Sequence, residues 1–158
     1  MSDDFSGAMH HANQHAGSSG DGNMFNQALS MLGGQKQHLQ NQDIDEQQAV
    51  QAHQQMYGNQ GGSANTQNMG MAAAMQALKT FTGGKGGGGG GQNQFIGMAM
   101  AEASKLFDQQ SAQGNAPPGG KQNAISSAAQ MALKMYMKSE MGGGSGGGGL
   151  MSLASKFF

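Results

Sequence analysis

The histidines near the N-terminus are the side chains whose type and spacing come nearest to a chemical site. His11 and His15 are four residues apart, so on a helix both imidazole rings would lie on one face and could bind a divalent metal ion together. No cysteine occurs in the chain, and no acidic residue adjoins the pair. Because zinc sites use three or four protein ligands, we expect no metal and no other cofactor, with His11 and His15 as weak candidates for a surface metal site.

Glycine-rich stretches place a serine and two lysines in patterns that resemble catalytic motifs. Residues 143–147 match the nucleophile elbow G-x-S-x-G, but that motif needs a strand before the serine and a helix after it. Lys85 and Lys121 each follow a glycine pair, as in phosphate-binding loops, yet neither is followed by Ser or Thr. We therefore expect no catalytic residue and no enzymatic activity.

The apolar content of the chain comes mainly from alanine and from 15 methionines, while Leu, Ile, Val and Phe are scarce. Methionine thioethers can bind copper when they cluster as Met-x-x-Met, but Met98 with Met100 and Met135 with Met137 do not form dense clusters of that kind. Soft packing between helices is the better interpretation of the methionines.

The charge content excludes several classes of partner. All eight basic residues are lysine, and the net charge is −1, so the basic excess and the arginine forks of nucleic-acid readers are missing. The first residues are acidic and no run of 18 apolar residues occurs, which predicts neither a signal peptide nor a membrane span. We expect a cytoplasmic protein that does not bind nucleic acid.

A five-residue cassette, Ala-x-Lys-x-aromatic, occurs four times, at 77–81, 103–107, 132–136 and 154–158. One turn upstream of each copy another small or apolar residue continues the spacing of four, so each copy predicts a helix with one apolar stripe and a lysine on the other side. We predict that these stripes form the self-association face: Ala73, Ala77, Phe81, Ala99, Ala103, Phe107, Ala128, Ala132, Tyr136, Leu150, Ala154 and Phe158.

The cassettes require helices to position them, and the sequence predicts an all-α fold of short amphipathic Ala/Met-rich helices in a repeat array. We expect two parts: a Gln/His-rich part over 1–64 with two or three helices, and a four-cassette repeat over 65–158 with poly-glycine linkers. The predicted helices of the second part cover 66–82, 93–110, 122–141 and 149–158. Those of the first part cover 3–15, 24–32, which we expect to end at Gly33-Gly34, and 43–57.

Five stretches resemble a family of small proteins of unknown function from filamentous fungi, the so-called beta-flanking proteins, which carry a domain of unknown function. The stretches are 48–58, 71–84, 94–110, 127–140 and 148–158, and they include all four cassettes. The resemblance implies a fungal, cytosolic protein. It implies no activity and no active-site residue.

One cassette helix cannot be stable alone. Ordering a dozen residues costs on the order of 15–20 kcal/mol, of which burying one Phe and a few Ala or Met side chains returns a third to a half. Several helices must therefore pack together, so we expect a non-enzymatic structural protein whose partner is itself, as a homo-oligomer or filament, with a stress-linked role. The alternatives are a peripheral membrane or lipid-coating protein and a glycine-rich disordered protectant or condensate former.

Overall fold

The computed structural model describes six segments of the chain: residues 6–17, 22–40, 51–55, 66–82, 91–114 and 120–142. They contain helices α1 (Ser6–Ala16), α2 (Gly22–Gln40), α4 (Thr66–Thr82), α5 (Gly91–Ala112) and α6 (Gly120–Gly142). Residues 51–55 form a further short helical segment, and the described segments hold no strand. The all-α prediction is therefore confirmed for this part of the chain, while the repeat array stays a prediction.

The three cassette helices that the structure describes agree closely with their predicted ranges. α4 covers the predicted 66–82, and α5 and α6 extend the other two predictions by no more than two residues at either end. At the end of α5 the amide of Gly114 donates to the carbonyl of Ser111 at 3.1 Å, and Gly114 has a φ of 82°. Glycine is favoured here because this left-handed backbone would strain a residue with a side chain.

The predicted end of the second helix at Gly33-Gly34 is wrong, because α2 continues through both glycines to Gln40. Glycine inside a helix costs roughly 1 kcal/mol relative to alanine, but α2 is anchored by Phe25, Leu29 and Leu32, all of which are buried. Packing of this kind outweighs the local preference. Of the predicted helix over 43–57, only 51–55 is described, and the predicted helix over 149–158 lies outside the described residues.

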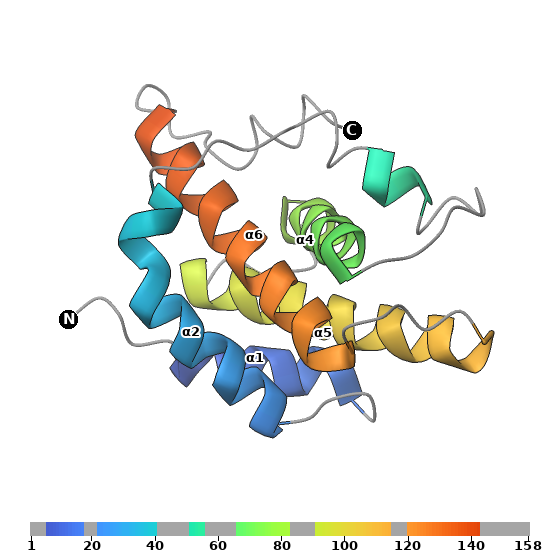
Figure 1. Cartoon of the computed structure of the whole chain (residues 1–158). Helices are drawn as coiled ribbons and strands as arrows, with labels where there is room; N and C mark the ends of the chain where they lie inside the picture. Colours follow the sequence, from blue (N-terminus) through green and yellow to red (C-terminus); the bar gives the residue numbers. More distant parts are fainter. Residues whose placement is uncertain are drawn as a thin grey trace.

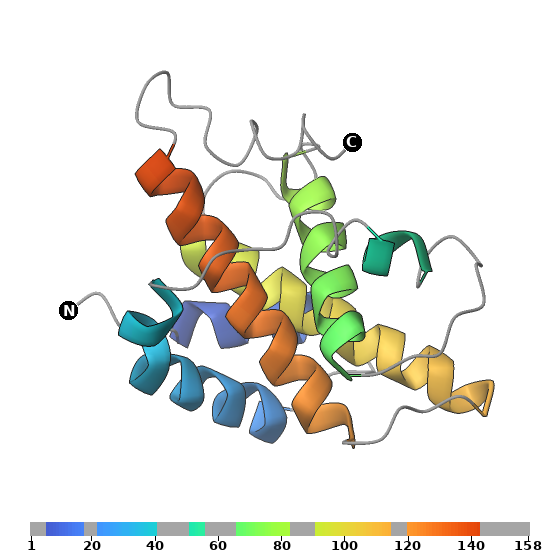
Figure 2. The same cartoon turned by 45° about the horizontal axis from the view of Figure 1, so that its top comes forward.

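Helix α5 is the centre of the fold. It packs against α1, α4 and α6, and α6 in turn packs against α2 and α4, as Figures 1 and 2 show. All eight residues from 94 to 101 are buried, so this part of α5 is covered by its neighbours on every side. The C-terminal end of α5, exposed over 111–114, projects beyond the other helices.

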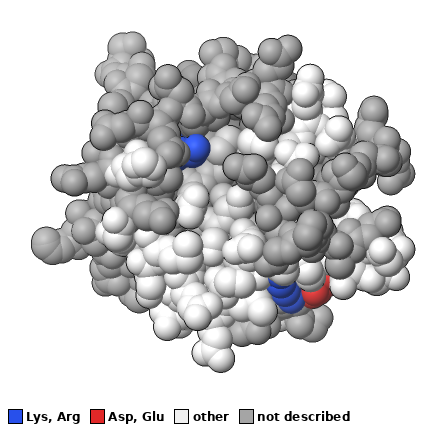
Figure 3. Space-filling view, viewed as in Figure 1, with Lys and Arg blue, Asp and Glu red and all other residues white. Residues whose placement is uncertain are grey.

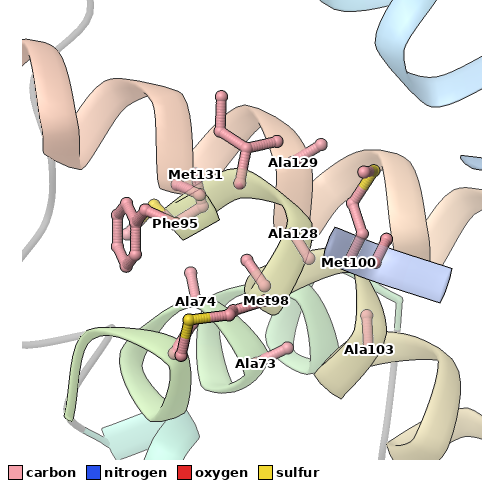
Figure 4. Close-up of a cluster of buried hydrophobic side chains, with 14 of the residues drawn as sticks. Ala73, Ala74, Phe95, Met98, Met100, Ala103, Ala128, Ala129 and Met131 are labelled. Carbon is pink, nitrogen blue, oxygen red and sulfur yellow. The ribbon is translucent and has the colours of Figure 1, made fainter. Parts of the chain in front are cut away.

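The core is built from many small side chains around a few large ones. Its main cluster joins buried residues of α1, α2, α4, α5 and α6, and Figure 4 shows alanines and methionines of α4, α5 and α6 meeting beside Phe95. A second cluster joins Ala52 of the short helical segment to Met69, Ala72, Leu106 and Ala124. Small side chains let helix axes approach closely, whereas methionine fills the irregular gaps that remain.

Candidate functional site

The alanine stripes of the first three cassettes lie in the contacts between helices of a single chain. α4, α5 and α6 pack pairwise on one another. Every alanine of the predicted face on these helices has an exposed fraction of 0 %, namely Ala73, Ala77, Ala99, Ala103, Ala128 and Ala132. The stripe is therefore a surface by which one helix docks on another.

The aromatic ends of the stripes lie at the edge of this core. Phe107 is half-buried against the second cluster and Tyr136 against the main cluster. Phe81 lies in α4, but its side chain is outside the described part of the structure, as are all of Leu150, Ala154 and Phe158.

The cassette lysines differ from one another in their surroundings. Lys79 is exposed, and the side chain of Lys105 is 44 % exposed with its Nζ 3.6 Å from a carboxylate oxygen of Glu102. Lys134 is half-buried, and burial lowers the pKa of its ammonium group because the charged form loses hydration. The lysine side of α6 is therefore only partly open to water at Lys134, since α6 packs against three other helices.

Two glycines lie where the backbones of neighbouring helices approach closely, and sequence reasoning missed both. A Cβ atom placed on Gly97 of α5 would lie 2.5 Å from the carbonyl oxygen of Ala8 and 2.9 Å from the amide nitrogen of Ala12, both in the α1 backbone. A Cβ on Gly70 of α4 would meet Ser127 of α6 and lie 2.7 Å from the amide nitrogen of Ala128. Only glycine allows backbones to approach this closely. The presence of a glycine inside a predicted helix could have indicated such a close approach.

A row of polar contacts joins α2 to α6. The side-chain amide of Gln122 donates to the carbonyl oxygen of Met24 at 3.1 Å and to Oγ of Ser126 at 3.3 Å. The Ser126 hydroxyl then donates to Sδ of Met31 at 3.7 Å. Since Ser126 is buried, these bonds satisfy a polar group that would otherwise be costly inside the protein.

An ion pair joins the end of α5 to the start of α6. Nζ of Lys121 lies 3.1 Å from Oδ1 and 3.2 Å from Oδ2 of Asp108. Lys121, which follows a glycine pair without completing a phosphate-loop motif, thus pairs with a carboxylate where α5 and α6 meet.

Of the two histidine candidates for a metal site, the structure describes the side chain of His11 only. His11 lies where α1 meets α5, because a Cβ on Gly97 would be 2.7 Å from Cβ of His11, and the side chain of His15 is outside the description. Among the described residues, no group of three or more His, Cys, Asp or Glu could hold a metal ion.

His53 makes a contact that the sequence did not predict. Its Nε2 donates to Oε1 of Gln76 on α4 at 3.0 Å. Burial lowers the pKa of His53 most; the hydrogen bond to Gln76 opposes the shift, and the charge of Lys79 adds to it. This histidine therefore favours the neutral form and fastens the short helical segment to α4.

The described surface carries few charges. Figure 3 shows mainly uncharged side chains on the face that it presents, apart from the atoms drawn in grey. The exposed side of α2 shows the same character, with Asn23, Asn26, Gln27 and Ser30. None of the described helices is long and apolar enough to pass through a lipid bilayer.

Comparison with known proteins identifies a family. The family described as a domain of unknown function, DUF7721, matches residues 4–86, more than half of the 158 residues, and the chain belongs to this family. The resemblance to proteins with a domain of unknown function is thereby confirmed, although three of its five stretches lie beyond the match. Neither the curated proteins nor the solved structures gave a match.

Proposed function

We propose that this member of the DUF7721 family is a non-enzymatic structural protein that self-associates into a homo-oligomer or filament through its helix faces. One observation carries the proposal: the alanine stripes of α4, α5 and α6 are fully buried where these helices meet. The same spacing recurs in Leu150, Ala154 and Phe158. A fourth stripe of the same kind has the chemistry to dock on a helix of another copy.

The charge of the molecule supports association between copies. The net charge is −1, and the exposed residues of α2 are mostly Asn, Gln, Ser and Gly. Identical molecules with little net charge repel one another weakly. Uncharged amide and hydroxyl groups can also form hydrogen bonds with the same groups on a second copy, without the free-energy cost of removing a charged group from water.

The packing of the alanine stripes within the chain counts against the two alternatives. A peripheral membrane coat would need apolar helix faces free to enter the lipid, but the stripes of the three described cassettes are occupied by neighbouring helices. A disordered protectant would have no shared core, whereas the described helices bury Phe25, Phe95 and Ile125 together.

Light scattering after size-exclusion chromatography tests the proposal. We expect the full chain to have at least twice its chain mass of 16.2 kDa, rising with concentration. Ala154→Glu, which places a charge in the fourth stripe, should lower the mass, whereas Lys156→Gln on the other side of that cassette should leave it unchanged. A monomer at all concentrations would refute self-association.

Vesicle flotation separates assembly from membrane coating. We expect the full chain to stay at the bottom of the gradient with both neutral and anionic vesicles. Flotation that Ala154→Glu abolishes, with no change in mass, would favour the lipid-coating alternative.

The source and setting of the protein form part of the same proposal. The five resembling stretches support a fungal protein of the beta-flanking type, acting in the cytoplasm with a stress-linked role. Imaging of a fluorescent fusion before and after heat or oxidative stress tests this, and a fusion confined to an organelle would contradict it.

A further inference from the structure

We infer that residues 1–82 and 91–142 are complementary halves that two copies of the chain can exchange, so that the helices of one copy complete the core of another. This exchange rests on the proposed self-association and specifies which surfaces of the two copies would meet. In this arrangement α1, α2 and α4 of one chain pack against α5 and α6 of a second chain.

The contacts between helices run mainly from one half to the other. α1 packs on α5, α2 packs on α6, and α4 packs on both. Within the first half, α1 and α2 touch only lightly, and α4 has at most marginal contact with either of them. Helices α1, α2 and α4 therefore share almost no core with one another, and their apolar faces are covered mainly by the second half.

The two tight contacts at described glycines lie on this boundary. Gly97 of the second half receives the backbone of α1, and Gly70 of the first half receives α6 at Ser127. The hydrogen bond from Gln122 to the carbonyl oxygen of Met24 also joins the two halves. The centre of an interface between chains packs as densely as a protein interior, so the same contacts can form between two chains.

The second half has contacts of its own that can hold its two helices together during exchange. α5 and α6 pack on each other, and the ion pair between Asp108 and Lys121 joins them. The α5–α6 pair thus carries the faces on which α1, α2 and α4 pack. The family match at 4–86 falls on the half that must be covered.

Residues 83–90 connect the halves, and seven of these eight residues are glycine. A glycine-rich sequence favours no single backbone path, so it does not fix where the second half lies relative to the first. Exchange would replace each contact within a chain by the same contact between chains, so the balance depends on protein concentration. Reciprocal exchange closes a dimer, whereas head-to-tail exchange continues into a filament.

Cross-linking of the full chain tests the exchange, because a chain without cysteine allows two to be placed at will. The test pair is Met24→Cys with Gln122→Cys, across the two halves, where both residues are partly exposed and Nε2 of Gln122 lies 3.1 Å from the carbonyl oxygen of Met24. The control pair is Asp108→Cys with Lys121→Cys, within the second half, where Nζ and Oδ1 lie 3.1 Å apart. Each variant is treated with a short bis-maleimide and analysed on a denaturing gel.

We expect the test pair to give covalent dimers and a ladder of larger products, and the control pair to give mainly internally linked single chains. Mixing isotope-labelled with unlabelled chains before cross-linking should produce mixed dimers for the test pair. If the test pair unfolds the protein, Met31→Cys with Ser126→Cys, where Sδ and Oγ lie 3.7 Å apart, probes the same contact between α2 and α6.

Two other results would overturn the inference in distinguishable ways. If light scattering shows an oligomer but the test pair links only within single chains, the copies associate without exchange, and the proposed function stands. If light scattering shows a monomer, self-association itself fails and exchange fails with it.

Discussion

Gly97 occupies the point where the central helix meets the backbone of α1. The space for even one methyl group is taken by the carbonyl oxygen of Ala8 and the amide nitrogen of Ala12. Both are backbone atoms of a helix, so they cannot move aside as the end of a flexible side chain could. The packing of α5 on α1 therefore requires glycine at position 97. A larger residue there should lower the stability of the protein.

We predict that Gly97→Ala destabilises the protein by at least about 2 kcal/mol, because the added methyl group overpacks the contact between α5 and α1. Gly33→Ala is the matched control, since a Cβ there meets nothing within 4 Å. The control should raise stability by about 0.5–1 kcal/mol, because alanine is the better helix former. Urea unfolding followed by circular dichroism measures both. Equal effects would mean that α1 does not lie against Gly97.

His53 gives the described structure a predictable response to pH. Its folded-state pKa lies below the ordinary value of 6.5, because burial disfavours the charged ring more than the bond to Gln76 favours it, and Lys79 adds repulsion. Well above pH 6.5 the ring is neutral in both the folded and the unfolded chain. Below pH 6.5 the unfolded chain takes up the proton first, so this contribution to stability is lost as the pH falls through the folded-state pKa.

We therefore predict that the midpoint of urea unfolding falls between pH 7.5 and pH 5, and that His53→Gln reduces the slope. His38→Gln, at an exposed position of α2, serves as the control and should leave the slope nearly unchanged. A slope that responds to His38→Gln instead would show that His53 is not held against α4.

Each cassette helix has an alanine side and a lysine side, and the structure assigns them opposite roles in α5. Ala103 is fully buried, while Lys105 keeps much of its surface and forms an i, i+3 ion pair with Glu102. Exposed pairs of this kind contribute little to stability. The alanine side therefore determines how the helix packs.

We predict that Ala103→Leu costs roughly 1–3 kcal/mol by overpacking, while Lys105→Gln costs less than about 0.5 kcal/mol. Ala77→Leu and Lys79→Gln form a second matched pair on α4. Thermal melts of the four variants would rank them. If the lysine variants were the less stable ones, the packed face would have been assigned wrongly.

The spacing of alanine and aromatic residues was sufficient to predict α4, α5 and α6 with ends accurate to two residues, because a repeated stripe is a strong local signal. The same reasoning wrongly predicted that the second helix ends at Gly33. α2 continues because Leu29 and Leu32 are buried, and their burial depends on residues that are distant in the sequence. Equivalent alanine stripes also cannot specify which helix packs on which. The contact between His53 and Gln76 joins residues 23 apart in sequence. The local sequence around either residue does not indicate that the other is its partner.

The described helices of both halves form one core around α5, and this organisation underlies both proposals. The main cluster takes buried residues from α1 and α2 as well as from α4, α5 and α6. We expect these helices to unfold as one cooperative unit, because the first half has little core of its own once its contacts with the second half are lost.

Native-state hydrogen exchange on the full chain tests this shared core most directly. We predict that the most protected amides of α1, α4, α5 and α6 have similar opening free energies. Gly97→Ala, which disturbs a contact between α5 and α1, should lower protection in all four helices together, including α4, whereas Gly33→Ala should not. If Gly97→Ala left α4, α5 and α6 fully protected while α1 alone exchanged, the halves would not share one core.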